Sequence, residues 1–109
     1  MTTTPKALFE AKFAEATETV QYAANNCKTS IDKLTATNTG VANETITVHL
    51  LPPAGAAAAS NAIVKQLAPG VTWPFPEIVG HYLEAGGAIS TIASTANKIW
   101  IRGSGREFV

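Results

Sequence analysis

The stretch Asn43–Leu51, Asn-Glu-Thr-Ile-Thr-Val-His-Leu-Leu, alternates apolar and polar side chains more regularly than any other part of the chain. Successive side chains of a β-strand point to opposite sides, so a period of two predicts a strand with one face on a core. The predicted core face contains the apolar members: Ile46, Val48 and Leu50. The opposite face, towards water or a partner, contains the polar members: Thr45, Thr47 and His49.

Further segments with strand character lie on both sides of this stretch, separated by turn residues. Strands are predicted over residues 31–38, 61–67, 88–93 and 98–103. Hairpin turns are predicted at Asn38–Asn43, before the opening stretch, and at Ser94–Asn97, between the last two strands. Turn signals recur at intervals close to the roughly 8 to 12 residues typical of sandwiches. We therefore expect an all-β fold, a single antiparallel β-sandwich of immunoglobulin-like type with about seven to eight short strands.

The segment Pro5–Asn26 fits two interpretations. Propensity favours a helix with Thr4 as its cap and Pro5 at its first position, because apolar residues recur at helical spacing: Phe9, Phe13, Ala16 and Val20. Alternation instead predicts a strand, with one face formed by Ala7, Phe9, Ala11 and Phe13. That strand would turn at residues 15–18 and return over 19–23 as a hairpin. The β-rich remainder of the chain favours the hairpin.

The length of 109 residues suits one domain with one core. Residues 1–5 predict an extended N-terminal arm, and residues 6–109 the sandwich domain, with at most one short helical turn near Pro76–Leu83. The run Ala54–Ser60 has little side-chain volume, and we expect it to form a mobile loop or a surface that another chain approaches closely.

Charge and composition exclude several classes of partner. Eight Lys and Arg residues balance eight Asp and Glu residues, so we expect neither nucleic acid nor a membrane as a partner. A net charge of zero also lowers the repulsion between copies of the chain. The N-terminus lacks the pattern of a signal peptide, which predicts synthesis in a cytoplasm. Cys27 is the single cysteine, so no internal disulfide can form.

No set of residues predicts catalysis, a cofactor or a metal site. His49 and His81 are the two histidines, and they share no metal-ligand motif. Gly103–Gly105 resembles only part of a nucleophile elbow, and we expect it to form a bend. The sequence therefore predicts a protein that is not an enzyme.

Candidate partner contacts come from three places in the chain. The first is the threonine-rich arm: Thr2, Thr3 and Thr4. Aromatic residues form the second set and would serve as a sugar-stacking platform or an interface, namely Trp73, Phe75, Tyr82 and Trp100. Arg102 and Arg106, flanking the expected bend, would dock to an acidic neighbour.

Four segments together give the chain a resemblance to a known group: Thr35–Thr39, Leu50–Pro52, Pro76–Gly87 and Ile101–Glu107. Over roughly residues 8–109 the chain resembles small virion structural proteins of tailed bacteriophages. The resemblance implies a β-sandwich subunit present in several copies on the capsid, neck or tail. It implies contacts with copies of itself and with other virion proteins, and a place in the virion after synthesis in the bacterial host cytoplasm. It carries over no catalytic residues.

The exposed aromatic residues support an alternative function from another class. In that hypothesis the chain is a carbohydrate- or receptor-binding module, and its ligand is a glycan of the host surface.

Overall fold

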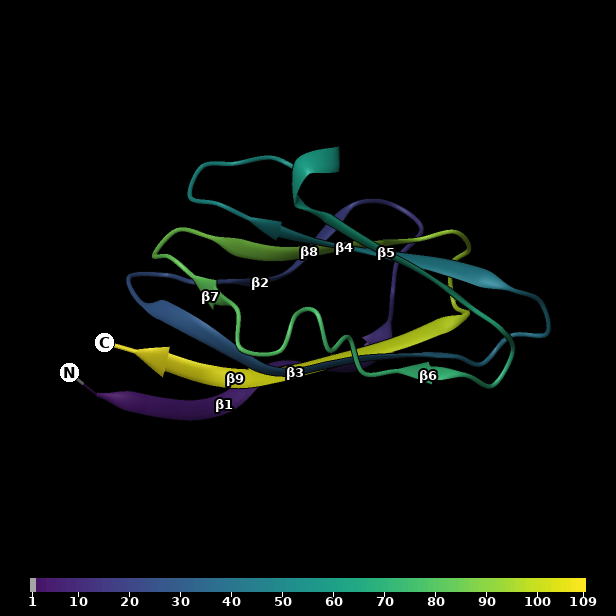
Figure 1. The fold of residues 1–109 in the computed structure, drawn as a ribbon, viewed down its shortest axis with the longest axis horizontal. Coiled ribbons are helices and arrows are strands. Elements are labelled where there is room, and N and C mark those ends of the chain that lie inside the picture. The colour runs from purple at the N-terminus through teal and green to yellow at the C-terminus, as the bar shows by residue number, and fades with distance from the viewer. Residues whose placement is uncertain (1) are drawn as a thin grey trace.

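The computed structural model describes residues 2–109, which form two antiparallel sheets packed face to face (Figure 1). Sheet A contains, in spatial order, β1 (Thr3–Phe13), β9 (Ile99–Phe108), β3 (Lys28–Asn38) and, both beside β3, β6 (Thr72–Trp73) and β7 (Tyr82–Leu83). Sheet B contains β2 (Thr19–Ala23), β8 (Ala88–Ala93), β4 (Glu44–Leu51) and β5 (Ala62–Leu67). The predicted all-β sandwich is confirmed.

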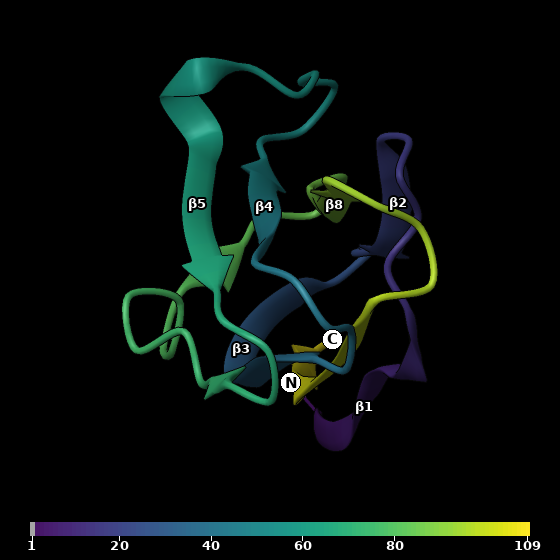
Figure 2. The same cartoon turned by 90° about the vertical axis from the view of Figure 1, so that its right-hand side faces the viewer.

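The strand order is that of a long hairpin wrapped into two layers. β6 and β7 pair with opposite ends of β3, so together they form one interrupted strand. Strands then pair from the ends inwards: β1 with β9, β2 with β8, β3 with β6 and β7, and β4 with β5. Pairing of β3 with β9 and of β4 with β8 completes the sheets, whose end-on arrangement is visible in Figure 2. This is the topology of a jelly roll, not of an immunoglobulin-like sandwich, in which the first two strands pair with each other.

Three connections that the sequence predicts as hairpin turns carry the chain from one sheet to the other. They join β1 to β2, β3 to β4, and β8 to β9. Both interpretations of Pro5–Asn26 are therefore wrong as complete descriptions: its two strands are present, but they lie in opposite sheets. Alternation defines which face of a strand is buried and contains no information about which strand lies beside it.

The core lies between the sheets and includes the predicted inward face of β4, where Ile46 and Val48 are fully buried. The loop between β6 and β7 also enters the core, because Phe75 and Ile78 are fully buried. At most one short helical turn was expected near Pro76–Leu83, and this segment contains no helix. The helical turn of residues 2–109 is a 3-10 helix, η1 (Ala59–Asn61), in the connection between β4 and β5. Ile78 N donates to Phe75 O over 2.9 Å and His81 N donates to Ile78 O over 3.0 Å, which makes two successive turns before β7. Burial of the two apolar side chains and pairing of β7 with β3 outweigh the local helical signal.

The bend expected at Gly103–Gly105 is also wrong, since β9 continues through it to Phe108. Irregularities in the neighbouring strands β1 and β3 bring other atoms close to these glycines. A Cβ atom on Gly103 would lie 2.8 Å from Phe9 Cε1, and one on Gly105 would overlap the carbonyl oxygen of Ser30. Glycine is required at these two positions because atoms of the adjacent strands β1 and β3 approach closely.

The predicted N-terminal arm is extended, but it is part of sheet A. Thr3 and Thr4 belong to β1, where they pair with Phe108 and Glu107. Thr2 N donates to Val109 O over 2.6 Å, and Val109 N donates back to Thr2 O over 2.9 Å. The two chain ends consequently lie together, as Figure 1 shows. Across residues 2–109, no helix has the length and apolar character needed to cross a bilayer.

Candidate interaction faces

The outer face of sheet B is almost free of charge, and we call it the neutral face. Cross-strand register places one set of residues on it: Val20, Thr45, Thr47, His49, Ala62, Val64, Gln66, Ser90 and Ile92. None of them is Lys, Arg, Asp or Glu. Two valines are more than half exposed, Val20 at 55% and Val64 at 62%. The face thus presents hydroxyl and aliphatic groups on a regular sheet surface.

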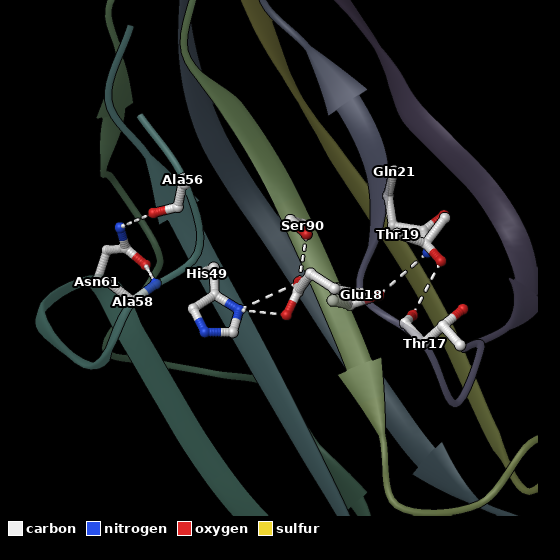
Figure 3. Close-up of polar contacts among 10 residues, drawn as sticks. Thr17, Glu18, Thr19, Gln21, His49, Ala56, Ala58, Asn61 and Ser90 are labelled. Carbon is white, nitrogen blue, oxygen red and sulfur yellow. Dashed lines mark hydrogen bonds and ion pairs between the residues drawn. The ribbon is translucent and has the colours of Figure 1, made fainter. Parts of the chain in front are cut away.

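A carboxylate from the connection between β1 and β2 is folded over the neutral face (Figure 3). Glu18 Oε1 and Oε2 lie 3.1 Å and 3.2 Å from His49 Nδ1, and Ser90 Oγ donates to the same carboxylate. His49 is 8% exposed. Ser90 donates to the carboxylate and not to the histidine, so this is not the arrangement that activates a serine nucleophile. The three groups fasten the connection onto β4 and β8, and His49 and Ser90 give the Glu18 carboxylate hydrogen-bond partners.

The edges of both sheets are poorly suited to adding a strand from another chain. β1 contains Pro5 and two irregularities in its pairing, and β2 has five residues with one irregularity. The edge formed by β6 and β7 is interrupted by the buried loop, and β5 turns Lys65 inwards, with Nζ 4.0 Å from the ring centroid of Trp73. Proline, irregular pairing, short strands and inward charges are the features by which natural sheets avoid edge association. Contact with a partner is thus easier through a face of the sandwich than through an edge.

The outer face of sheet A differs from the neutral face because it carries charged and aromatic side chains. Arg106 forms a paired contact with Asp32, with nitrogen-to-oxygen distances of 3.0 to 3.3 Å, and these hydrogen bonds raise the pKa of Arg106. Arg102 lies on the same face of β9 and forms no ion pair within residues 2–109. Trp100 packs against Phe13 with ring centroids 4.2 Å apart. The two arginines of this face are therefore in different states, one paired and one free of a carboxylate.

A shallow hollow surrounds Arg102 on this face, and we call it the Arg102 hollow. One half is bordered by Trp100 and by three threonines, Thr35, Thr37 and Thr72. The other half, beyond the shared residues Arg102 and Thr35, is bordered by polar side chains: Glu10, Lys33 and Ser104. The hollow exists because the residues of β1 and β9 beneath it are small, namely Ala7, Ala11 and Gly103. It combines one aromatic ring, several hydroxyls and a guanidinium.

A buried polar network joins the two sheets near the chain ends. The Tyr22 hydroxyl lies 2.7 Å from Thr29 Oγ1 and 2.5 Å from a carboxylate oxygen of Glu107. The hydrogen bond from Tyr22 holds the pKa of Glu107 below its ordinary value, while burial and this carboxylate raise the pKa of Tyr22. The network thus links β2 of sheet B to β3 and β9 of sheet A.

Within the described chain, residues 2–109, no three His, Cys, Asp or Glu side chains are grouped so that they could hold a metal ion.

The residues predicted for partner contact do not form one site. Phe75 is fully buried, so its side chain is not available to a partner, and the prediction for this residue is wrong. Trp73 is half-buried, and its Nε1 donates to Glu77 over 3.1 Å. Thr3 and Arg106 share the outer face of sheet A with Arg102, whereas Thr2 is bonded to Val109. Of the expected aromatic platform, Trp100 and Tyr82 remain exposed, at 40% and 63%.

Sequence reasoning missed the residues that surround Arg102 and those that cover His49. Thr72 is far from Thr35 and Thr37 in the chain, and only the pairing of β3 with β6 brings it beside them. Glu18 was expected in a hairpin turn, and no local pattern relates it to His49. Comparison of the chain with protein-family models, with curated proteins and with solved structures finds no match.

Proposed function

We propose that the chain is a structural subunit of the virion of a tailed bacteriophage, assembled in several copies on the capsid, neck or tail. It acts by subunit contact and without catalysis. The observation that carries the proposal is the neutral face, a whole sheet surface without Lys or Arg whose one overlying carboxylate is already paired with His49. Neither nucleic acid nor a membrane is part of the proposed function.

The neutral face suits contact with another copy of the same chain. When two copies meet, any charge in the interface must find a partner or lose stabilising free energy through desolvation. The neutral face brings no Lys or Arg into such a contact, and its overlying carboxylate, Glu18, is already hydrogen-bonded to His49 and Ser90. Val20 and Val64 supply exposed apolar area on its two edge strands, β2 and β5. Its interfacial residues are thus of the types found at the centre of subunit contacts, which are depleted in charge.

The fold supports the proposal by analogy. Jelly rolls are used repeatedly in viral capsid proteins, and also in lectins. A fold alone does not define a function, so the proposal rests more on the neutral face and on sheet edges that are poorly suited to adding a strand. They favour assembly through a face of the sandwich over assembly through the N-terminal arm or through a strand edge.

Self-association tests the proposal directly. We expect the wild-type chain to form oligomers in size-exclusion chromatography with light scattering, and Val64→Lys to shift it towards the monomer. Val41→Lys is the matched control, because Val41 is 95% exposed in the turn between β3 and β4 and lies off the neutral face. Mass spectrometry of purified phage particles would then locate the subunit. A chain that is monomeric at all concentrations and absent from particles would refute the proposal.

The alternative function, a carbohydrate-binding module for a host-surface glycan, keeps only part of its original basis. Trp73 and Phe75 point into or along the core, so of the three rings named for this function Trp100 is the one left to stack on a ligand, and Tyr82 is a further exposed ring. Glycan-array binding that is lost in a folded Trp100→Ala variant would favour this alternative.

A further inference from the structure

We propose that the Arg102 hollow binds an acidic carbohydrate, with Arg102 holding the sugar carboxylate. The hollow is on the outer face of sheet A, opposite the neutral face, so this proposal stands or falls independently of subunit assembly. It is carried by three features of the hollow: an arginine without a carboxylate partner, a border rich in hydroxyls, and an exposed indole ring.

Arg102 is the first feature, and Arg106 shows what it lacks. Both arginines point outwards from β9, but Arg106 already binds both carboxylate oxygens of Asp32. Arg102 forms no ion pair with any residue from 2 to 109. A guanidinium presents a planar set of donors that matches a carboxylate in a two-bond contact. Arg102 is thus the arginine on this face that remains able to bind a ligand carboxylate.

The hydroxyl border is the second feature. Thr37 Oγ1 and Thr72 Oγ1 lie 2.8 Å apart across the pairing of β3 with β6, which fixes two hydroxyls at one side of the hollow. Thr35 and Ser104 border the hollow nearer to Arg102. Hydroxyls both donate and accept hydrogen bonds, as the hydroxyls of a sugar require of their partners.

Trp100 is the third feature. Its ring is held by Phe13 at a centroid separation of 4.2 Å with planes inclined at 35°, and the residue remains 40% exposed. The apolar C–H face of a sugar ring can bury itself against such a held aromatic ring. Because Trp100 and Arg102 both border the same hollow, one sugar can contact the indole and the guanidinium together.

Charge in the hollow favours a sugar acid over a polyanion. Lys33 is the second cation, and Glu10 in the same half of the hollow offsets it. Nucleic acids are held mainly by several Lys and Arg side chains on successive phosphates. The hollow has only two cationic side chains, Arg102 and Lys33, which are too few to hold successive phosphates. One guanidinium, several hydroxyls and one aromatic ring instead match a carboxylated sugar.

Calorimetric titration of the full chain with oligogalacturonate and with sialyllactose tests the proposal. We expect binding of at least one of them, with little binding of methyl-esterified oligogalacturonate or of lactose, which lack the charge. Arg102→Gln should weaken binding roughly tenfold or more, since hydrogen bonds to charged groups are the strong ones. Arg106→Gln is the matched control and should leave binding within about twofold of the wild type, because its guanidinium is already occupied.

Two further variants separate binding from folding. Thr37→Val keeps the side-chain shape and removes one hydroxyl, and Trp100→Ala removes the stacking ring. Both should weaken binding while circular dichroism remains that of the wild type. The proposal is overturned if neither acidic sugar binds the wild-type chain, if the uncharged sugars bind equally well, or if Arg106→Gln weakens binding as much as Arg102→Gln.

Discussion

Replacing Gly105 by alanine should destabilise the protein strongly, although the added group is a single methyl. Gly105 lies within β9, which is flanked by β1 and β3. It is paired with Lys6 on β1 and with Ile31 on β3. Its Cβ atom would overlap the carbonyl oxygen of Ser30 and would lie 3.1 Å from Leu8 Cδ1. Leu8 can move, but the carbonyl belongs to the backbone of the adjacent strand. The sheet itself must therefore shift.

The expected cost follows from this geometry. Inserting a methyl group into a packed region costs typically about 1 to 3 kcal/mol, and an immovable neighbour places Gly105→Ala at or above the upper end. A loss of about 3 kcal/mol is a large part of the roughly 5 to 15 kcal/mol by which proteins are stable. With a urea slope of about 1 to 3 kcal/mol per molar, the midpoint should fall by about 1 to 3 M.

Urea unfolding followed by tryptophan fluorescence measures this effect, and two variants control for it. Ser104→Ala alters the residue before Gly105, whose side chain points outwards, and should change the free energy of unfolding by less than about 0.5 kcal/mol. Gly70→Ala has nothing within 4 Å of the new Cβ atom but a φ angle of +80°, so it should show only the backbone strain, about 1 to 2 kcal/mol. A Gly105→Ala protein as stable as Ser104→Ala would refute the steric argument.

Three further predictions concern the core and the polar network. Tyr22→Phe should cost about 1 to 2 kcal/mol at neutral pH. The fold lowers the pKa of Glu107, so the stability that the Tyr22–Glu107 hydrogen bond contributes is present above the unfolded pKa of Glu107 and is lost as pH falls through its folded pKa. Urea unfolding between pH 7 and pH 3 should therefore show the free energies of unfolding of wild type and Tyr22→Phe becoming more alike in acid. Phe75→Ala should lose about 3 to 5 kcal/mol in thermal unfolding, while Val79→Ala, half exposed in the same loop, should lose little. Asn38→Ala should lose about 1 to 3 kcal/mol, because the fully buried amide donates to Ala42 O and Leu67 O; equal stability to wild type would show that water replaces it.

Most of the longer strands were predictable from sequence because each is decided by its own residues, whereas the two-residue strands β6 and β7 were not predicted. The alternation in Asn43–Leu51 defines β4 and its buried face correctly, with Ile46 and Val48 in the core. In β5, Leu67 lies in the core and Ile63, four residues before it on the same face, packs against the core. Burial of alternate side chains is a local consequence of strand geometry, so a local pattern is sufficient.

Strand pairing was not predictable in the same way. The turn residues at Asn38–Asn43 are compatible both with a hairpin and with a crossing between sheets, and the crossing is what the structure contains. Gly103 and Gly105 were read as a bend because the sequence does not reveal that Phe9 and Ser30 lie against them. In each example the deciding contact is with a residue that is distant in the chain.

The same limit applies to the candidate sites. Arg102 and Arg106 look equivalent in sequence, since they flank the same segment, Gly103–Gly105. They differ because Asp32 lies beside one of them, and that depends on the register of β3 against β9. The neutral face was partly visible, because Thr45, Thr47 and His49 were expected to face outwards. Its lack of cations appears only when four strands are placed side by side.

The position of β9 at the centre of sheet A has a consequence for biosynthesis. β1 and β3 do not pair with each other, and each of them is joined to the sheet through β9. During translation the ribosome releases β1 and β3 long before β9, so until β9 emerges β1 has no partner in sheet A and β3 can pair only with the two-residue strands β6 and β7. Sheet A is therefore completed by non-local pairing, which is slow and leaves strands open to association. We expect nascent chains arrested before residue 99 to depend on chaperones, whatever the stability of the finished sandwich.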